Sequence, residues 1–88
     1  MKMSKNKYFT YILLCSDNSL YTGITTDLER RTEEHNSSDK GAKYTKARRP
    51  VTLVYNEEHL DRSSASKREY IIKKLSKKEK QILINIEL

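Results

Sequence analysis

The chain has 88 residues, enough for one domain with one small core, because a chain of this length buries only about 60 to 65% of its unfolded surface. Charged residues make up 34% and hydrophobic residues 35%, a composition too apolar for a largely disordered chain. Lysines and arginines outnumber acids by 18 to 12, and the net charge of +6 favours an anionic partner such as nucleic acid.

Cysteine content and hydropathy indicate the compartment. The single cysteine, Cys15, cannot form an internal disulfide, which fits a reducing environment. The longest apolar run, residues 11–15, is far shorter than the roughly 20 residues of a membrane-spanning helix, and no secretory segment is recognisable. We expect a soluble cytoplasmic protein without membrane contact, built as one domain over residues 1–88, with disorder confined to residues 1–6 and the last few residues.

The first predicted element is a β-hairpin. Residues 8–15 are rich in aromatic and β-branched side chains, a turn-forming cluster follows at 16–19, and residues 20–24 resume the strand pattern. Because side chains alternate along a strand, a two-residue turn would place Tyr21 on the face opposite Tyr11. A three-residue loop that pairs Tyr21 with Leu13 or Cys15, or a bulge, would place both phenols on one face.

Three helices and a third strand follow. Thr26 and Glu29 have the spacing of a capping box, which predicts a helix from Thr26 to about Asn36. Alternation predicts a strand over residues 51–55, and helical spacing predicts a helix over 61–75. A second capping box at 76–79 predicts a last helix, which we prefer over the strand that alternation after residue 81 also fits. The expected fold is α+β, a three-stranded antiparallel sheet flanked by helices in the order β-β-α-β-α-α.

The first predicted helix carries two polar side chains on its apolar stripe. Residues three, four and seven apart share a helix face, so Arg31 and His35 lie on the same stripe as Leu28. Arg30 lies about 100° away and can form an ordinary surface pair with Glu34. A solvated helix anchored by Leu28 alone would also fit this spacing.

The two tyrosines and this stripe together resemble the signature of the GIY-YIG nuclease superfamily. Phe9-Thr10-Tyr11 stands at its first motif and Tyr21-Thr22-Gly23 at its second, with Phe9, Thr10 and Thr22 in place of the usual glycine and isoleucines. Segments 43–45, 49–51, 67–70 and 73–75 are similar to the small stand-alone members of YhbQ/YazA type. The resemblance covers nearly the whole chain. It implies a GIY-YIG endonuclease-like fold with both phenols on one face of the sheet.

The resemblance also implies a catalytic set, namely Tyr11, Tyr21, Arg31, His35 and Glu69. Tyr21 would be the general base, Tyr11 would orient the water or phosphate, and His35 would relay the proton or position Tyr21. A phenol with an ordinary pKa of about 10 needs nearby positive charge for this task. Arg31 would supply that charge and hold the phosphate, because a guanidinium grips phosphate bidentately. Packing alone is the alternative role of each tyrosine.

Glu69 is the expected metal ligand. It shares a helical stripe with Ala65 and Ile72, so it faces the core side, where an unpaired carboxylate would be costly. A bound Mg²⁺ or Mn²⁺ would offset that cost, and Mg²⁺ commonly takes only one or two protein carboxylates while it keeps several waters. The alternative is a surface pair between Glu69 and Lys73.

Residues 40–49, the basic segment, contain five lysines and arginines and no acid. Phosphates contact such segments, and an aromatic ring among the cations can stack on a base, although a solvated loop is the alternative. The expected nucleic-acid-binding residues are Lys40, Lys43, Tyr44, Lys46, Arg48 and Arg49.

These features favour a divalent-metal-dependent endonuclease that hydrolyses DNA phosphodiester bonds, structure-specific in DNA repair or recombination. The substrate could be branched, nicked or single-stranded DNA, and the need for a protein partner is left open. The alternative is a nucleic-acid-binding module that has the same fold and basic surface but little or no catalysis.

Overall fold

The computed structural model describes residues 7–86. Its elements are β1 (Tyr8–Leu14), β2 (Leu20–Thr25), α1 (Leu28–Ser37), α2 (Lys43–Lys46), β3 (Thr52–His59), α3 (Arg62–Lys73) and α4 (Lys77–Ile84). This order confirms the expected α+β fold and adds α2, a four-residue helix that has no side-chain cap and is too short for a periodic pattern. The termini predicted to be disordered, residues 1–6 and 87–88, lie outside the described residues.

The sheet is antiparallel throughout, in the order β2-β1-β3, with a bulge between Ile12 and Leu13 where β1 pairs with β3. The hairpin register pairs Leu13 with Tyr21. Its loop is residues 16–18: the backbone N–H of Asn18 donates to Cys15 at 2.9 Å, and Asn18 has a left-handed φ of 68°. This is a three-residue hairpin loop, in which an αL residue follows a turn. The expected same-face arrangement of Tyr11 and Tyr21 is therefore confirmed.

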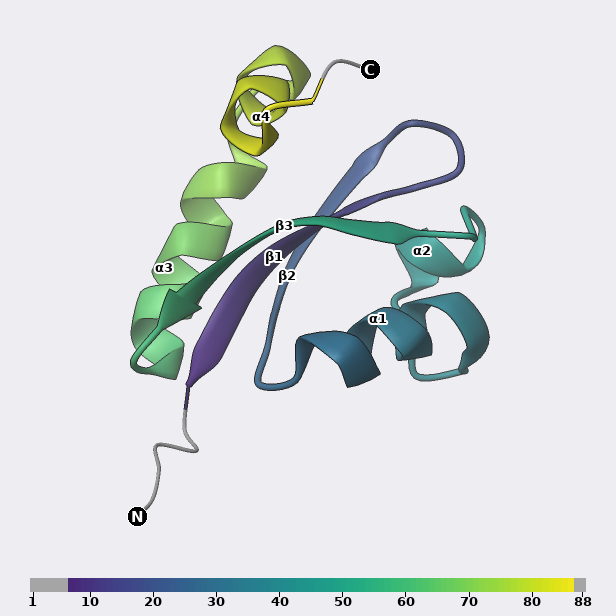
Figure 1. The fold of residues 1–88 in the computed structure, drawn as a ribbon, viewed down its shortest axis with the longest axis horizontal. Coiled ribbons are helices and arrows are strands. Elements are labelled where there is room, and N and C mark those ends of the chain that lie inside the picture. Colours follow the sequence, from purple (N-terminus) through teal and green to yellow (C-terminus); the bar gives the residue numbers. More distant parts are fainter. Residues whose placement is uncertain (1–6, 87–88) are drawn as a thin grey trace.

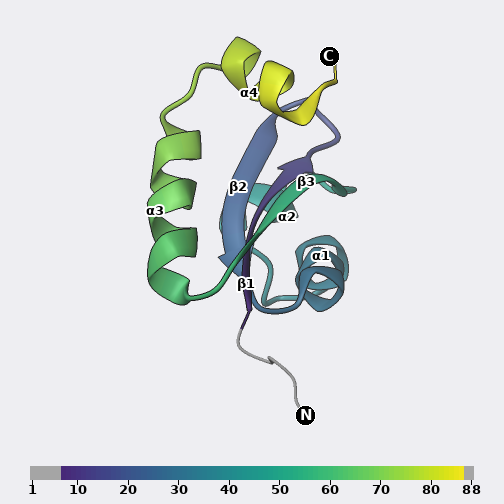
Figure 2. The same cartoon turned by 60° about the vertical axis from the view of Figure 1, so that its left-hand side comes forward.

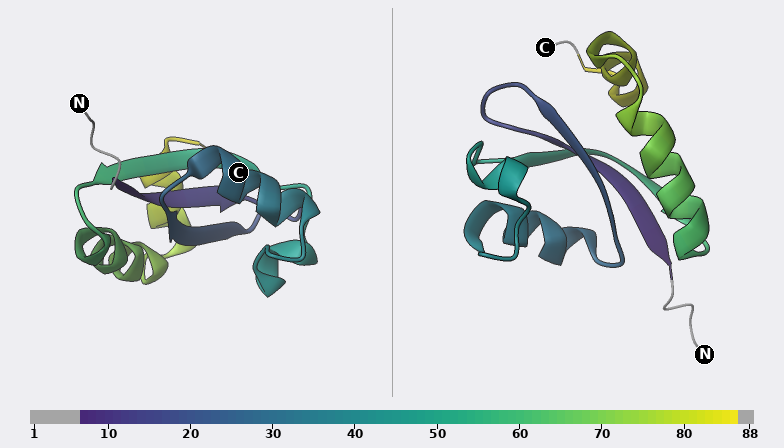
Figure 3. Two further views of the ribbon diagram at one scale, coloured as in Figure 1. Left: turned by 90° about the horizontal axis from the view of Figure 1, so that it is seen from below. Right: turned by 180° about the vertical axis from the view of Figure 1, so that it is seen from behind.

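Two layers of helices cover the two faces of the sheet (Figures 1 and 2). Tyr11, Leu13 and Cys15 pack toward α1. Ile12 points the other way and packs against Ile72 of α3, with Ile84 of α4 in the same cluster. Seen from below (Figure 3, left), β2 forms one edge of the sheet, with α2 near one of its ends and α3 near the other. The two tyrosines thus belong to the layer that α1 covers.

The helix ends follow the predicted capping with one correction. Asp27, not Thr26, caps α1: its carboxylate accepts from the backbone N–H of Arg30 at 3.0 Å. The Thr25 hydroxyl accepts from the N–H of Asp27 at 3.1 Å, which fixes the turn one residue later than the sequence pattern suggests. The second capping box is confirmed: Ser76 and Glu79 exchange both bonds at the start of α4, which is a helix as preferred.

The third strand is longer than the five predicted residues. It reaches His59 because Glu57 and Glu58 pair with the start of β1. These charged residues interrupt the alternation of apolar side chains from which the strand was predicted. Over residues 7–86, no helix is both long and apolar enough to cross a membrane.

Candidate active site

The side chains of the first predicted helix and the hairpin meet around His35, which is fully buried. Its Nε2 lies 2.8 Å from the Tyr11 hydroxyl. The Tyr21 ring meets the imidazole edge-on, with 5.2 Å between ring centroids. The solvated-helix alternative therefore fails for His35. The hydrogen bond goes to Tyr11, whereas Tyr21 contacts His35 only through its ring.

Thr45 of α2 fixes the tautomer of His35. Its Oγ1 lies 2.7 Å from Nδ1 of His35 and donates to the carbonyl oxygen of Ala42 at 2.9 Å. A hydroxyl that gives its proton to a carbonyl must accept from the imidazole, so Nδ1 carries the proton and Nε2 accepts from Tyr11. The N–H of Ala42 approaches Nδ1 at 3.4 Å, which alone would favour the other tautomer. We assign the first tautomer because its bonds are much shorter.

The electrostatics keep this pair neutral. Burial lowers the pKa of His35 to about 4, and the charge of Arg31 acts in the same direction. Burial raises the pKa of Tyr11 to about 12. The nearby Arg31 guanidinium opposes this shift, because a positive charge stabilises the phenolate. At neutral pH the Tyr11 hydroxyl therefore keeps its proton and donates it to an uncharged imidazole.

Arg31 stands one turn before His35 on α1, with its side chain 25% exposed. Its Nη1 donates to Glu34 and to the carbonyl oxygen of Lys40, both at 2.8 Å. Burial alone would lower the pKa of Arg31, but the hydrogen bond to Glu34 and the nearby Tyr11 phenol outweigh it and raise the pKa. The predicted pair of Arg30 with Glu34 also forms, at 3.6 Å. Arg31 is thus a permanently charged group anchored beside Tyr11.

Gly23 explains why the second motif needs a glycine. It pairs with Tyr11 across the hairpin. A Cβ at this position would lie 2.6 Å from the Tyr11 hydroxyl oxygen and 2.7 Å from its Cζ. The phenol ring therefore lies over the bare backbone of β2, and any side chain at Gly23 would displace it.

Glu69 comes from α3, in the other helical layer. Its side chain is 23% exposed, and its carboxylate lies 3.1 Å from the Lys73 ammonium, so the surface pair considered as an alternative does form. Its charge is one of the smaller influences that raise the pKa of Tyr11. Among the described residues, no hydrogen bond joins Glu69 to the other four predicted catalytic residues.

Glu69 is the candidate protein ligand for a divalent ion. Within residues 7–86, no three His, Cys, Asp or Glu side chains gather as a ready-made metal site. Glu69 alone, partly exposed, suits Mg²⁺, which commonly keeps several waters and shares substrate phosphates. Glu69 would hold such an ion, with Lys73 competing for its carboxylate.

Tyr44 of α2 extends the cluster outward. Its ring stacks on that of Tyr21 with 5.9 Å between centroids and 26° between planes, and the Arg48 guanidinium lies 3.9 Å from its centroid. Arg48 is also bonded to Asp17 at 3.0 Å. Tyr44, 38% exposed, is therefore already packed between neighbours and is not an open platform for a base.

The other cations of the basic segment divide into two groups. Arg49 donates to carbonyl oxygens at the C-terminal end of α1, those of Glu34 at 3.2 Å, Ser38 at 2.6 Å and His35. Helix ends leave such carbonyls without partners, so Arg49 has a structural task. The remaining three are exposed and form no ion pair within residues 7–86, namely Lys40, Lys43 and Lys46.

Two contributing residues have no signal in the sequence. Thr45 lies in a segment similar to the small stand-alone family members, but its partner His35 lies ten residues away in another helix. Asn36, expected to lie where the helix frays, clamps the backbone of Val51 with bonds of 2.7 and 2.9 Å. Neither contact has a periodic signal.

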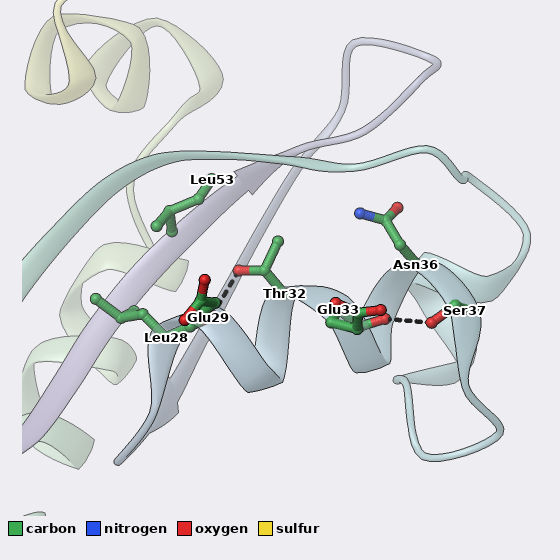
Figure 4. A pocket seen from close by; sticks show the side chains of 7 residues that line it. All are labelled: Leu28, Glu29, Thr32, Glu33, Asn36, Ser37 and Leu53. Atoms are coloured by element: carbon green, nitrogen blue, oxygen red, sulfur yellow. Dashed lines mark hydrogen bonds between the residues drawn. The ribbon is translucent and has the colours of Figure 1, made fainter.

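A separate depression of about 630 Å³ lies between α1 and β3 (Figure 4). Leu28 and Leu53 form its apolar part, and Glu29 and Glu33 stand beside them. It includes none of the five predicted catalytic residues, and its glutamates would repel phosphate.

Comparison with known sequences agrees with the geometry. Residues 7–82 match the GIY-YIG catalytic domain. The UPF0213 protein DP2720 of Desulfotalea psychrophila is 61% identical over 77 residues, which cover 88% of this chain and 70% of that protein. The UPF0213 protein YazA of Bacillus subtilis is 46% identical over 82 residues, which cover 93% of this chain and 82% of that protein.

Two solution NMR structures are also similar to this chain. The UPF0213 protein BH0048 from Bacillus halodurans has a TM-score of 0.58 at 43% identity, covering 90% of this chain and 83% of its own. The protein EF2693 from E. faecalis has a TM-score of 0.59 at 46% identity, covering 93% and 88%. This chain therefore belongs to the UPF0213 family and carries a GIY-YIG catalytic domain.

Proposed function

We propose that the protein is a divalent-metal-dependent endonuclease that hydrolyses DNA phosphodiester bonds. The observation that supports it best is the chain of hydrogen bonds from Tyr11 through His35 to Thr45, set beside the charged Arg31. Packing alone does not require a buried histidine with hydrogen bonds at both ring nitrogens next to an anchored arginine, and such arrangements are typical of functional sites.

Arg31 would bind the scissile phosphate and stabilise the charge that develops on its oxygens. A divalent ion, which domains of this family typically use, would supply further positive charge at the phosphate, with Glu69 as its protein ligand. Tyr11 would orient the attacking water or the phosphate.

The pKa values favour a positioning role for His35. Burial raises the pKa of Tyr11 to about 12 and lowers that of His35 to about 4, so transfer of the Tyr11 proton to His35 is unfavourable in the resting protein. His35 would therefore position Tyr11 rather than deprotonate it. Tyr21 remains the proposed general base, since its ring packs against His35 and its hydroxyl makes no hydrogen bond within residues 7–86.

The charge distribution indicates where nucleic acid is attracted. Residues 62–80, which include most of α3 and α4, carry eight lysines and arginines against two glutamates, whereas residues 7–61 carry eight against nine acids. The positive charge of the basic segment is therefore offset by acids elsewhere in residues 7–61, whereas that of residues 62–80 is not. We propose that exposed cations of α3 and α4 provide long-range attraction to DNA, and that Lys40, Lys43 and Lys46 add local phosphate contacts.

The ion pair between Glu69 and Lys73 favours a second candidate, a DNA-binding module without catalysis. An assay on branched, flapped, nicked and single-stranded DNA with Mg²⁺, Mn²⁺ or EDTA separates the two. The nuclease should cut with metal and not with EDTA, and Arg31→Ala should slow cutting about a hundredfold or more. Arg68→Ala is the control, because this guanidinium is paired with Glu57 at 2.9 Å. A wild type that binds but cuts none of these DNAs would favour the module.

Metal binding can be tested without cleavage. Increasing Mn²⁺ should broaden the NMR amide signals around Glu69, and Glu69→Gln should abolish this. Lys73→Ala should lower the Mn²⁺ concentration needed about twofold, because an exposed ion pair of modest strength no longer competes. Lys74→Ala, one residue further along and over the Tyr70 ring, is the matched control. Broadening that persists in Glu69→Gln would remove Glu69 as the ligand.

A further inference from the structure

A polar pocket of about 370 Å³ opens beside Arg31, where β1 begins and β2 ends. Arg30 and Arg31 reach it from α1, and Arg62 reaches it from the first turn of α3. Tyr8 and Thr26 also line this arginine pocket. In the sequence, Arg30 has the spacing of an ordinary surface residue, and no pattern predicts a role for Arg62. Two helical layers therefore contribute guanidinium groups to one small space.

The arginine pocket has more positive charge than its surroundings neutralise. Glu34 is the one acid that lines it, and this carboxylate is already shared between Arg31 at 2.8 Å and Arg30 at 3.6 Å. Asp61, next to Arg62 in the chain, is occupied as the N-cap of α3 and accepts from Ser64 at 2.8 Å. Arg62 forms no ion pair within residues 7–86. Three arginines with one shared glutamate leave a net charge of +2, which favours an anion.

Arg31 belongs both to this pocket and to the cluster around Tyr11. A nucleic-acid strand with one phosphate at Arg31 would therefore carry its next phosphate into a positively charged recess. Tyr8 and Thr26 offer hydroxyl donors to the same ligand. Because the charges are spread over two helices, a chain with linked phosphates at Arg31 and in the pocket should bind more tightly than a lone anion.

We propose that the arginine pocket binds the backbone phosphate adjacent to the scissile one, with Arg30 and Arg62 as its ligands. This inference rests on the proposed function, since it takes Arg31 as the residue at the scissile phosphate. It assigns to Arg62, a residue of the opposite helical layer, a role in fixing the strand across the site.

The test measures binding in EDTA, so that it does not depend on cleavage. The isotope-labelled protein is titrated by NMR with a thymidine dinucleotide that has a 5′-phosphate, and therefore two phosphates, and with the same dinucleotide without it. The wild type should bind the two-phosphate ligand about fivefold or more tightly, as expected for one further charged contact at an exposed site. Signals of Thr26 and Arg62 should shift with the two-phosphate ligand.

Two variants of α3 make the comparison specific. Arg62→Ala should lose the preference for the second phosphate, and Lys67→Ala, an exposed cation five residues later that does not line the pocket, should retain it even if its overall affinity falls. Equal preferences in both variants would overturn the proposal. So would inorganic phosphate binding in the pocket as tightly as the two-phosphate dinucleotide, because the pocket would then be a free-anion site. A protein inert in cleavage that still shows the Arg62-dependent preference would retain the subsite and lose the nuclease.

Discussion

Thr45→Val tests the hydrogen-bond chain at the centre of the site. Valine keeps the shape of threonine but removes the hydroxyl that accepts from Nδ1 of His35 at 2.7 Å. Both residues are fully buried, so water cannot replace the lost partner. A buried donor left without an acceptor costs about 1 to 3 kcal/mol, and in a domain of this size each kcal/mol lowers Tm by roughly 4 to 8 °C.

The imidazole has one way to limit this cost. It can move its proton to Nε2, so that Nδ1 accepts from the N–H of Ala42, now 3.4 Å away, and Nε2 donates to Tyr11. The Tyr11 hydroxyl would then accept where it now donates, and its own proton would point elsewhere. We therefore expect both a lower free energy of unfolding and a changed tautomer.

Urea unfolding measures the first effect, and the nitrogen chemical shifts of the imidazole measure the second. Thr45→Ser keeps the hydroxyl and should keep the tautomer, with only the cost of a missing methyl group. If Thr45→Val has the wild-type tautomer and the wild-type stability, Thr45 does not orient His35, and the assigned direction of the chain is wrong.

Three further predictions follow from contacts around the same site. Gly23→Ala should lower the free energy of unfolding, measured in urea, by about 1 to 3 kcal/mol and break the hydrogen bond between Tyr11 and His35, because the new Cβ would lie 2.6 Å from the phenol oxygen. Unchanged stability would refute the close approach. The pKa of His35 falls from 6.5 to about 4 on folding, so the unfolded chain takes up a proton that the folded protein refuses, and stability present above pH 6.5 should be lost toward pH 4 by roughly 3 kcal/mol. Urea titrations should show a larger loss in the wild type than in His35→Gln, which keeps only the loss from carboxylates such as Glu34 and Glu57, and equal pH profiles would contradict it. Neutralising Lys40, Lys43 and Lys46 together should flatten the salt dependence of duplex DNA binding by about 0.9 log–log units per lost phosphate contact without changing the fold, and an unaltered slope would remove these lysines from the interface.

The fold was predictable because its signals are local and periodic. The turn-forming cluster at 16–19, the alternation in the strands and the capping residue Ser76 each specify neighbours a few positions away. The hairpin register was less predictable, because the alternation of side chains allows Tyr21 on either face, depending on the loop length. Asn18, with its left-handed φ, selects the three-residue loop.

The roles of charged residues were less predictable, because a charge shows the need for a partner but not its identity. Arg49 looks like a phosphate ligand in the sequence, yet its guanidinium satisfies the carbonyl oxygens at the end of α1. Arg62 looks like an ordinary helix-start residue, yet it reaches the same pocket as Arg31. Each of these distinctions depends on which helix end or pocket lies nearby in space.

The site also depends on both helical layers at once. Tyr11, His35 and Thr45 belong to the layer of α1 and α2, whereas Glu69 and Arg62 belong to α3. The face of β1 opposite Tyr11 holds α3 to the sheet. There the Thr10 hydroxyl donates to the carbonyl oxygen of Ala65 at 3.0 Å, and Ile12 packs on Ile72. Since Tyr11 stands between Thr10 and Ile12 in β1, one strand sets the spacing between the tyrosine cluster and the α3 groups. Loosening α3 would therefore separate the proposed metal ligand and the second phosphate ligand from Arg31 while the bond between Tyr11 and His35 stays intact.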